Sequence, residues 1–491
     1  MSKIFIKIQQ ATFRHRNQTF YENFNWAIHE GEHWIITGNC GAGKTSLVHA
    51  LSGKYFPVKG TIEYPFLANQ QDSYLTLRRQ LIRVVSFRDD SRVFSPNLYF
   101  YQQRYNAFAA DGTLTVWEYL MNAGFDERIE DHIKLTKKTG IYPLLDVERI
   151  KLSSGQSRKL LITKALLQSP KILIIDNPYL GLDASSREEF NALLDQLVVE
   201  EGLQLILVGQ YEVLPACMTH CLQLDDFKII YEGTLSNLPT KNIDKTLYAP
   251  SPILEQLRHL YVPPKQPSQT IFDLQNVSVQ YYQKSILQHI NWRVEKGDKW
   301  ALLGHNGSGK STILSLLFGD HPQAYANDIY LFGQKRGMGQ SIWDIKKNTG
   351  FTSPELHYFF SYAITCVQTV ITGLFDHVYL KRAPSEEEQL LINLFFQYFG
   401  LTHLKDRSFQ EVSTGEQRTI LFIRALIKNP PLLLLDEPFQ GFDPPSIAKA
   451  KRLLDTILTD EHTLVFISHY KKEIPSCVEK MAYLENGKLS M

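Results

Sequence analysis

The sequence predicts an α/β protein built from two copies of one phosphate-binding domain, and two observations carry this prediction. The phosphate-loop pattern G-x-x-x-x-G-K-[ST] occurs twice, as GNCGAGKT at residues 38–45 and as GHNGSGKS at residues 304–311. An apolar run that ends in Asp also occurs twice, as ILIIDNP at residues 172–178 and as LLLLDEP at residues 432–438. Such runs are typical of parallel strands buried on both faces, which are found in α/β domains.

Further motifs repeat in the same order and indicate a duplication of the whole domain. LSSGQSRK at residues 152–159 matches VSTGEQRT at residues 412–419, and each turn precedes its acidic strand at the same spacing. Each copy would be about 240 residues long, which is within the range of one domain. We therefore expect a first domain over residues 1–246, a proline-rich linker over 247–270 and a second domain over 271–491.

The composition is that of a soluble globular protein. Of the 491 residues 44% are hydrophobic, and 52 basic against 51 acidic residues give a net charge of +1. This balance gives no strong signal for binding nucleic acid or an anionic membrane. Five cysteines spread along the chain do not form a secreted disulfide framework, and no apolar segment approaches the ~18 residues that a spanning helix needs. We expect a cytoplasmic protein with no membrane span of its own.

The elements of each copy follow from local patterns. Alternating apolar residues at 4–13 and 271–279 predict an antiparallel β layer ahead of each phosphate loop. Strands alternating with helices after the loop predict a parallel sheet. The segment between the loop and the repeated turn is rich in helix signals and predicts a helical subdomain. SEEEQLLINLFFQYFG at 385–400 combines a Ser cap, an acidic first turn and a Gly stop.

Other segments allow two interpretations. The prolines of the linker favour a semi-rigid connector, within which a short helix over residues 253–259 is compatible with the sequence. The aromatic residues of segment 97–120 are expected to pack in the core, and an exposed subset would instead offer a docking surface.

The two phosphate loops are expected to bind nucleotide. Their glycines let backbone N–H groups approach phosphates, and the helix that follows contributes the positive end of its dipole. Lys44 and Lys310 are expected to contact the outer phosphates. The predicted nucleotide-binding residues are Gly38, Asn39, Cys40, Gly41, Ala42, Gly43, Lys44, Thr45 and Ser46 in the first copy, and Gly304, His305, Asn306, Gly307, Ser308, Gly309, Lys310, Ser311 and Thr312 in the second.

A magnesium ion is expected to accompany the nucleotide at each loop. The hydroxyl groups of Thr45 and Ser311 are placed to help hold Mg²⁺, and the strand-ending carboxylates of Asp176 and Asp436 are placed to complete its shell.

The copies differ at the positions expected to carry hydrolysis. Glu437 follows Asp436, where a carboxylate can orient or deprotonate the water that attacks the γ-phosphate. His469 follows the next apolar strand and is placed to reach that phosphate. The first copy has Asn177 and Gln210 instead, and a neutral amide cannot take the proton. We expect its site to hold ATP but to turn it over slowly or not at all.

Over essentially the whole chain these motifs resemble the ATP-binding cassette (ABC) ATPases, whose signature is similar to the two repeated turns. In that family two cassettes close head to tail, so that each site joins one phosphate loop to the signature of the other cassette. The resemblance thus implies an intramolecular cassette dimer with one consensus and one degenerate site. The signature residues implied are Ser153, Gly155 and Gln156 facing the Glu437 site, and Ser413, Gly415 and Glu416 facing the degenerate site.

Two further family positions are informative. Tyr281 lies where an aromatic side chain stacks on adenine in the family, and His15 is its match in the first copy. The glutamine that follows the next strand in the family is absent from both VVSFRDD at residues 84–90 and GFTSPEL at residues 350–356. This absence puts the family's usual route to a partner subunit in doubt.

Segments 319–351 and 353–357 are similar to the tandem cassettes associated with molybdate transport, the photorepair type. This resemblance implies an ATPase that uses ATP and Mg²⁺ to energise or regulate a transport system. It admits a membrane permease subunit as partner and a peripheral location at the inner face of the plasma membrane. Two alternatives stay open, namely the ATPase of a sugar or vitamin importer, and a soluble cassette protein acting on ribosomes or nucleic acid. The short linker and the near-zero net charge disfavour the last.

Overall fold

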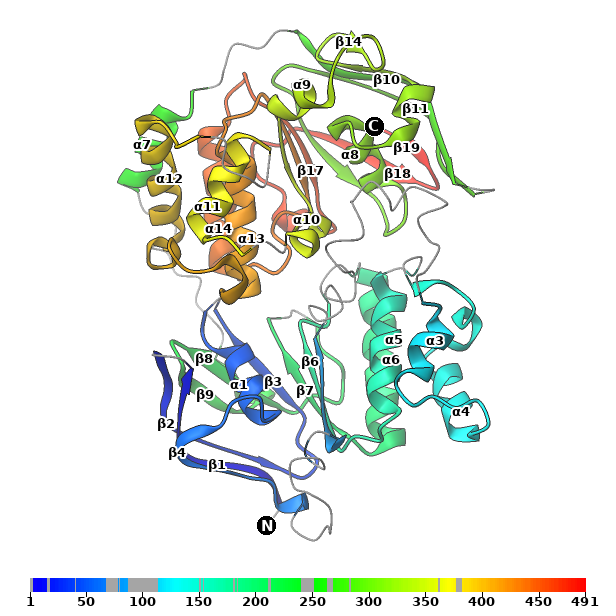
Figure 1. The fold of residues 1–491 in the computed structure, drawn as a ribbon, viewed down its shortest axis with the longest axis vertical. Helices are drawn as coiled ribbons and strands as arrows, with labels where there is room; N and C mark the ends of the chain where they lie inside the picture. The colour runs from blue at the N-terminus through cyan, green and yellow to red at the C-terminus, as the bar shows by residue number, and fades with distance from the viewer. Residues whose placement is uncertain are drawn as a thin grey trace. The chain divides into compact units, whose positions relative to one another are not determined.

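The computed structural model describes most of the chain, and the described residues fall into two compact units, one within residues 1–242 and one from residue 243 onward (Figure 1). Each unit holds one copy of the repeat. The domain ends at residues 246 and 270 stay predictions, because residues 240–250 and 263–267 lie outside the described part. The described residues are 3–15, 18–39, 41–67, 78, 80–86, 114–149, 152, 154–179, 182, 184–210, 213–239, 251–262, 268–281, 284–360, 363–376 and 382–491.

The first unit combines an antiparallel sheet with a larger, mostly parallel one. The antiparallel sheet has the order β2-β1-β4, and the larger sheet has the order β5-β6-β7-β3-β8-β9, in which only the pairing of β8 with β9 is antiparallel. The strands are β1 (Ile4–His15), β2 (Gln18–His29), β3 (Trp34–Gly38), β4 (Pro57–Glu63), β5 (Ile82–Ser86), β6 (Ile172–Asp176), β7 (Gln204–Val208), β8 (His220–Asp225) and β9 (Lys228–Thr234). The α-helices are α1 (Lys44–Leu51), α3 (Val116–Met121), α4 (Glu130–Lys138), α5 (Ser154–Leu166) and α6 (Ala184–Glu201).

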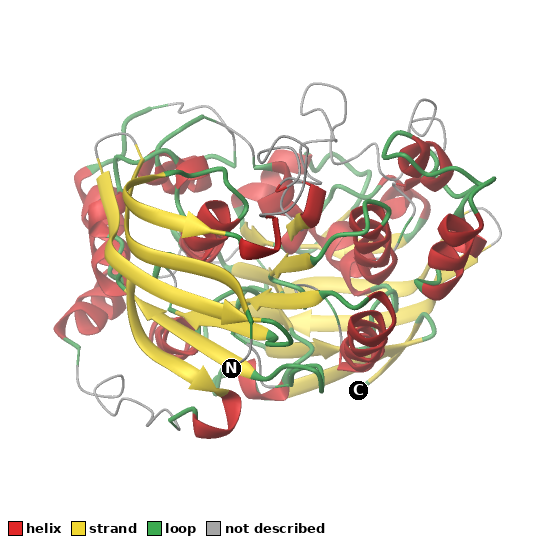
Figure 2. Cartoon of the chain, turned by 90° about the horizontal axis from the view of Figure 1, so that it is seen from below, coloured by secondary structure: helices red, strands yellow, loops and turns green. Residues whose placement is uncertain are grey.

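The second unit repeats this plan. Its antiparallel sheet has the order β11-β10-β13-β14, and its larger sheet has the order β15-β16-β17-β12-β18-β19. The strands are β10 (Thr270–Tyr281), β11 (Lys284–Glu295), β12 (Lys299–Leu303), β13 (Asp328–Leu331), β14 (Gln334–Lys335), β15 (Thr349–Thr352), β16 (Leu432–Asp436), β17 (Thr463–Ile467), β18 (Lys480–Glu485) and β19 (Lys488–Ser490). The α-helices are α7 (Pro252–Leu260), α8 (Lys310–Phe318), α9 (Ile342–Lys347), α10 (Pro354–Phe359), α11 (Cys366–Ile371), α12 (Glu386–Phe399), α13 (Thr414–Leu426) and α14 (Pro444–Ile457). Figure 2 shows these strands in yellow and the helices that pack beside them in red.

The predicted α/β class and the antiparallel β layer of each copy are therefore confirmed. The order of the larger sheet also decides where chemistry can occur. β17 lies between β12, which leads into the phosphate loop, and β16, which ends in the acidic residues. Because these three strands are parallel, their carboxyl ends meet at one edge of the sheet, where ligands of open α/β sheets bind.

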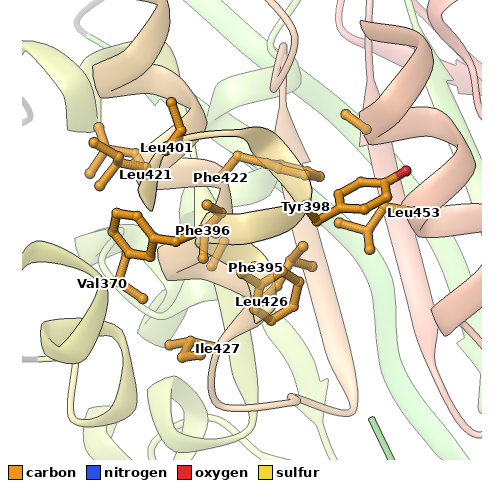
Figure 3. Packing of buried hydrophobic residues seen from close by; sticks show 14 of the residues in the cluster. Val370, Phe395, Phe396, Tyr398, Leu401, Leu421, Phe422, Leu426, Ile427 and Leu453 are labelled. Atoms are coloured by element: carbon orange, nitrogen blue, oxygen red, sulfur yellow. The ribbon is translucent and has the colours of Figure 1, made fainter. Parts of the chain in front are cut away.

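The acidic strand of each unit is buried on both faces. In β16, Leu432 and Leu434 contribute to the core under the antiparallel layer, whereas Leu433 and Leu435 contribute to the core under the helices. Figure 3 shows part of the helical core, with Phe395, Leu426 and Leu453 among its labelled side chains. This double burial explains why the strand carries no polar residue before its last position.

Two helical predictions for the second unit agree with the structure. Helix α12 begins after Ser385, whose side chain accepts a hydrogen bond from the Glu388 N–H, and it ends at Gly400, which has φ 75°. Helix α7 occupies the position expected for a short helix within the linker. It packs against α12, and the hydroxyl of the following Tyr261 donates to the Leu426 carbonyl at 2.9 Å. Part of the predicted linker is thus anchored in the core of the second unit.

The aromatic segment of the first copy is only partly described. Residues 97–113 lie outside the described part of the chain. Within α3, Val116, Tyr119 and Leu120 are buried in a small core cluster, which agrees with packing for this end of the segment.

Candidate functional site

The phosphate loop of the second unit connects β12 to α8. Gly309 precedes the helix with φ 108°, and no side chain caps the helix at this end. The N–H groups of the first turn thus face the loop, where they suit an anionic ligand. Gly304 has φ 152°, and a Cβ atom there would lie 2.3 Å from the Leu484 carbonyl oxygen. Only glycine fits at this position.

The lysine of each loop is oriented by the loop's own carbonyl groups. The Lys310 ammonium donates to the carbonyls of Gly304 and His305 at 2.7 and 2.8 Å. The Lys44 ammonium makes the same two contacts in the first unit, with Gly38 at 2.8 Å and Asn39 at 2.7 Å. Lys310 is only 6% exposed, so its buried positive charge favours an anionic partner.

A hydroxyl group and a carboxylate meet beside each lysine. The Ser311 hydroxyl donates to Asp436 Oδ2 at 2.9 Å, and the Thr45 hydroxyl lies 3.5 Å from Asp176 Oδ2. Both aspartates are buried at the ends of their strands. Hard oxygen atoms of this kind are the ligands that Mg²⁺ prefers, and Mg²⁺ commonly takes only one or two of them from the protein beside substrate phosphates. These side chains therefore fit a phosphate-bound magnesium ion.

Glu437 and His469 form a close pair at the same edge of the sheet. His469 Nε2 lies 2.7 Å from Glu437 Oε1, and the side chains are only 8% and 16% exposed. Glu437 has φ 44°, a backbone conformation that is rare outside glycine and is found at functional sites. Burial alone raises the pKa of Glu437, but the hydrogen bond and charge of His469, with the nearby charge of Lys310, bring it below the ordinary value. The carboxylate is therefore ionised at neutral pH and can accept a proton.

The first unit keeps the backbone geometry but not the proton acceptor. Asn177 also has a positive φ, of 55°. Its amide donates to Asp176 Oδ1 at 2.8 Å, and the Gln210 amide donates to the Gly38 carbonyl at 2.7 Å. These amides complete a hydrogen-bond network around the loop, in which neither can serve as a general base.

The signature turns begin helices α5 and α13. In the second unit Ser413 and Glu416 form a capping box, in which the Ser413 N–H donates to Glu416 at 2.6 Å and the Glu416 N–H lies 3.3 Å from the Ser413 hydroxyl. The departure of Glu416 from the family pattern therefore has a local structural role. In the first unit Gly155 and Gln156 lie in the first turn of α5.

Several predicted site residues are placed only in part. Cys40 and Ser153 lie outside the described residues, and so does the side chain of His15. Tyr281 is the last residue of β10, and its hydroxyl lies 2.5 Å from His321 Nε2. Its stacking on adenine stays a prediction, as does the crossing of signature turns between the two units.

A small pocket beside Glu437 contains residues that the sequence did not single out. Ser353 follows β15, where the family's glutamine is missing, and its hydroxyl caps α10. His357 on α10 bonds through Nε2 to Gln417 Oε1 at 2.8 Å. The Ser353 cap follows a local Ser-Pro helix start, whereas the contact between His357 and Gln417 joins residues 60 positions apart that no local motif pairs. The pocket is lined by Thr352, Ser353, Pro354, His357, Arg418, Leu421, Asp436, Glu437 and Pro438.

Comparison with known proteins identifies the family of the chain. The family model described as ABC transporter matches residues 21–180 and 287–440, which span both phosphate loops and both acidic strands. The chain belongs to the ABC transporter family. It is a tandem ABC ATP-binding protein and an ATPase, as predicted. Among the described residues of this ABC protein, no helix is both long and apolar enough to cross a membrane.

Relatives match this ABC protein over nearly its whole length. It is 32% identical to the ABC transporter ATP-binding protein ModF of Escherichia coli, over 99% of this chain and 98% of that protein. It is 31% identical to an uncharacterized ABC transporter ATP-binding protein of Schizosaccharomyces pombe, over 99% of both chains. Among solved structures, the complex of archaeal ribosomal stalk protein aP1 and ribosome recycling factor aABCE1 matches with a TM-score of 0.53 at 18% identity, covering 98% of this chain and 89% of that one. This last likeness concerns the fold only.

We predict that Glu437→Gln lowers steady-state ATP hydrolysis by about 100-fold or more, because it removes the proton acceptor and leaves both phosphate loops intact. Phosphate release measures turnover, and equilibrium binding of a fluorescent ATP analogue should be unchanged. Asn177→Ala, the matched change in the first unit, should leave turnover within a few-fold of the parent. If Glu437→Gln retained near-parental turnover, Glu437 would not be the base.

Proposed function

We propose that this protein is an asymmetric ATPase, in which the second unit's phosphate loop serves the hydrolysing site and the first unit's loop serves a site that holds ATP. The observation that carries the proposal is the contrast at one backbone position. Glu437 pairs with His469 at 2.7 Å, whereas Asn177 donates to Asp176 at 2.8 Å. The larger sheets of the two units have the same strand order, and the units differ in whether a proton acceptor stands beside the loop.

Each side chain at the hydrolysing site has a role that follows from its position. The Lys310 ammonium and the N–H groups at the start of α8 would bind the outer phosphates. Ser311 and Asp436 would hold Mg²⁺, which supplies positive charge against the phosphate oxygens when bound. Glu437 would orient the attacking water and accept its proton, while His469 keeps the carboxylate in place and ionised.

We further propose that the working state is a head-to-tail closure within one chain. Gly155 and Gln156, at the start of α5, would then complete the Glu437 site, and Ser413 and Glu416 would complete the first-unit site. The two signature turns also differ, since Glu416 bonds to the Ser413 N–H within its capping box, whereas the matching residue of the first unit is the neutral Gln156.

We predict that Lys44→Ala and Lys310→Ala have unequal effects. Lys310→Ala should abolish turnover, since it removes the charge that binds phosphate beside the base. Lys44→Ala should reduce bound ATP from two to one per chain and should slow turnover through weaker closure, without removing the chemistry. Equilibrium dialysis with a non-hydrolysable ATP analogue and phosphate-release assays measure the two quantities. If each variant removed half of the turnover, the sites would be equivalent and independent.

We propose that the task of this protein is to energise or regulate a transport system through ATP turnover. The sequence resemblance indicates a system of the molybdate type. Near full-length similarity to ModF, whose name describes an ABC transporter ATP-binding protein, supports this assignment. The partner would be a membrane permease subunit contacted in the ATP-closed state.

We predict that the Glu437→Gln protein, loaded with ATP and used as bait, retains a permease subunit from detergent-solubilised membranes of its own host, since ATP would stabilise the closed state. The Glu437→Gln protein without nucleotide is the control. Retention of ribosomal proteins instead, or of no membrane protein, would contradict the transport assignment.

A further inference from the structure

The catalytic carboxylate has a second partner besides His469. Gln440 lies in the turn that follows β16, and its side-chain N–H donates to Glu437 Oε2 at 2.7 Å. The other end of the same amide faces Arg418 on helix α13, whose Nη1 donates to Gln440 Oε1 at 2.7 Å and to the Gln440 main-chain carbonyl at 2.5 Å. Gln440 therefore connects helix α13 to the catalytic carboxylate.

The chemistry of the side chains fixes which group donates and which accepts in each hydrogen bond between Arg418, Gln440 and Glu437. A guanidinium group can only donate, so the amide oxygen of Gln440 has to face Arg418. The amide nitrogen is then left to face Glu437, which as a carboxylate can only accept. One carboxylate oxygen of Glu437 thus accepts a hydrogen bond from Gln440, and His469 Nε2 lies 2.7 Å from the other. Bonds to charged groups are stronger than neutral ones, so the orientation of the carboxylate depends on both.

Arg418 is itself firmly placed. It is 6% exposed and lies one turn after Gly415 on α13, the helix that begins with the second unit's signature turn. A helix moves as a rigid element, so a shift of residues 413–416 on contact with nucleotide would carry Arg418 with it. The Arg418 shift would in turn act on Gln440.

The first copy lacks both the glutamate and the glutamine of the second copy. DEPFQGFD at residues 436–443 corresponds to DNPYLGLD at residues 176–183, so Leu180 stands in the sequence where the second copy has Gln440. A leucine cannot form either hydrogen bond. The arginine is kept in both copies, since Arg158 corresponds to Arg418 and is also buried.

We propose that Gln440 is a positioning residue for Glu437, and that the Arg418–Gln440–Glu437 connection transmits the state of the second unit's signature turn to the hydrolysing site. The inference rests on the proposed function, because it takes Glu437 as the base and places that signature turn on the nucleotide held by the first unit. It gives the non-hydrolysing site a regulatory role, in which ATP held there sets the carboxylate for turnover in the other site.

The test compares Gln440→Met, which keeps the length of the side chain but cannot form either bond, with Gln389→Met on the exposed face of α12. We expect Gln440→Met to lower kcat by about 10- to 100-fold, a typical effect of misplacing a catalytic group, with KM for ATP within twofold of the parent. Gln389→Met should leave both constants unchanged. Parental kcat in Gln440→Met would overturn the positioning role. Gln440→Asn, which keeps the amide but shortens it, is the second variant if the first fails to fold.

Two double variants separate this role from a merely structural one. In a Glu437→Gln background, Gln440→Met should cause no further loss of the residual turnover, because it acts through the carboxylate. In a Gln440→Met background, Lys44→Ala should cause a smaller fold loss of kcat than it causes in the parent, because only its effect on closure remains. Multiplicative losses in either pair would overturn the connection. Near-parental turnover of Glu437→Gln itself would instead show that the proposed function has failed.

Discussion

A charged carboxylate buried at the end of a parallel strand is stable only where donors hold it and nearby positive charge offsets the loss of water. In the second unit this constraint organises the site around Glu437. β16 is apolar on both faces until its last residue, so the acidic pair emerges only at the sheet edge. His469 lies just after the neighbouring strand β17, and Gln440 lies in the turn that follows β16. Lys310, at the start of α8, adds positive charge nearby, and the arrangement that stabilises the carboxylate also keeps it ionised, as the proposed proton transfer requires.

The first unit shows what remains of this arrangement when the charge is removed. The strand order of its larger sheet is the same, its lysine makes the same two carbonyl contacts, and Asn177 keeps the positive φ of its counterpart. The amide does not need a histidine partner, and Gln210 bonds to the loop carbonyl of Gly38 instead. The first copy thus differs from the second at the proposed base, at its histidine neighbour and at the glutamine together. A chain that retains a complete phosphate loop beside these differences is better explained by a holding role than by decay.

Much of the fold and of the site could be predicted from the sequence, because the responsible signals are local. Phosphate loops, alternating β segments and the Ser385 cap with its Gly400 stop all depend on residues close together in the chain. The contact between Arg418 and Gln440 could not be predicted, since it joins residues 22 positions apart on different elements and no motif pairs them. The anchoring of Tyr261 in the second unit depends on the Leu426 carbonyl, 165 residues away. The capping role of Glu416 is predictable from the sequence as well, because S-x-x-E is a capping-box pattern.

We propose that one chain holds one ATP while it hydrolyses another, and this asymmetry can be measured by counting the nucleotides bound to the protein during turnover. The protein would be incubated with excess ATP and Mg²⁺ and passed rapidly through a desalting column, and its bound ATP and ADP would be quantified per chain over time. We expect one equivalent of intact ATP that persists over many turnovers, beside a second nucleotide that converts to ADP and exchanges. Conversion of both bound nucleotides to ADP at equal rates would contradict the proposed asymmetry.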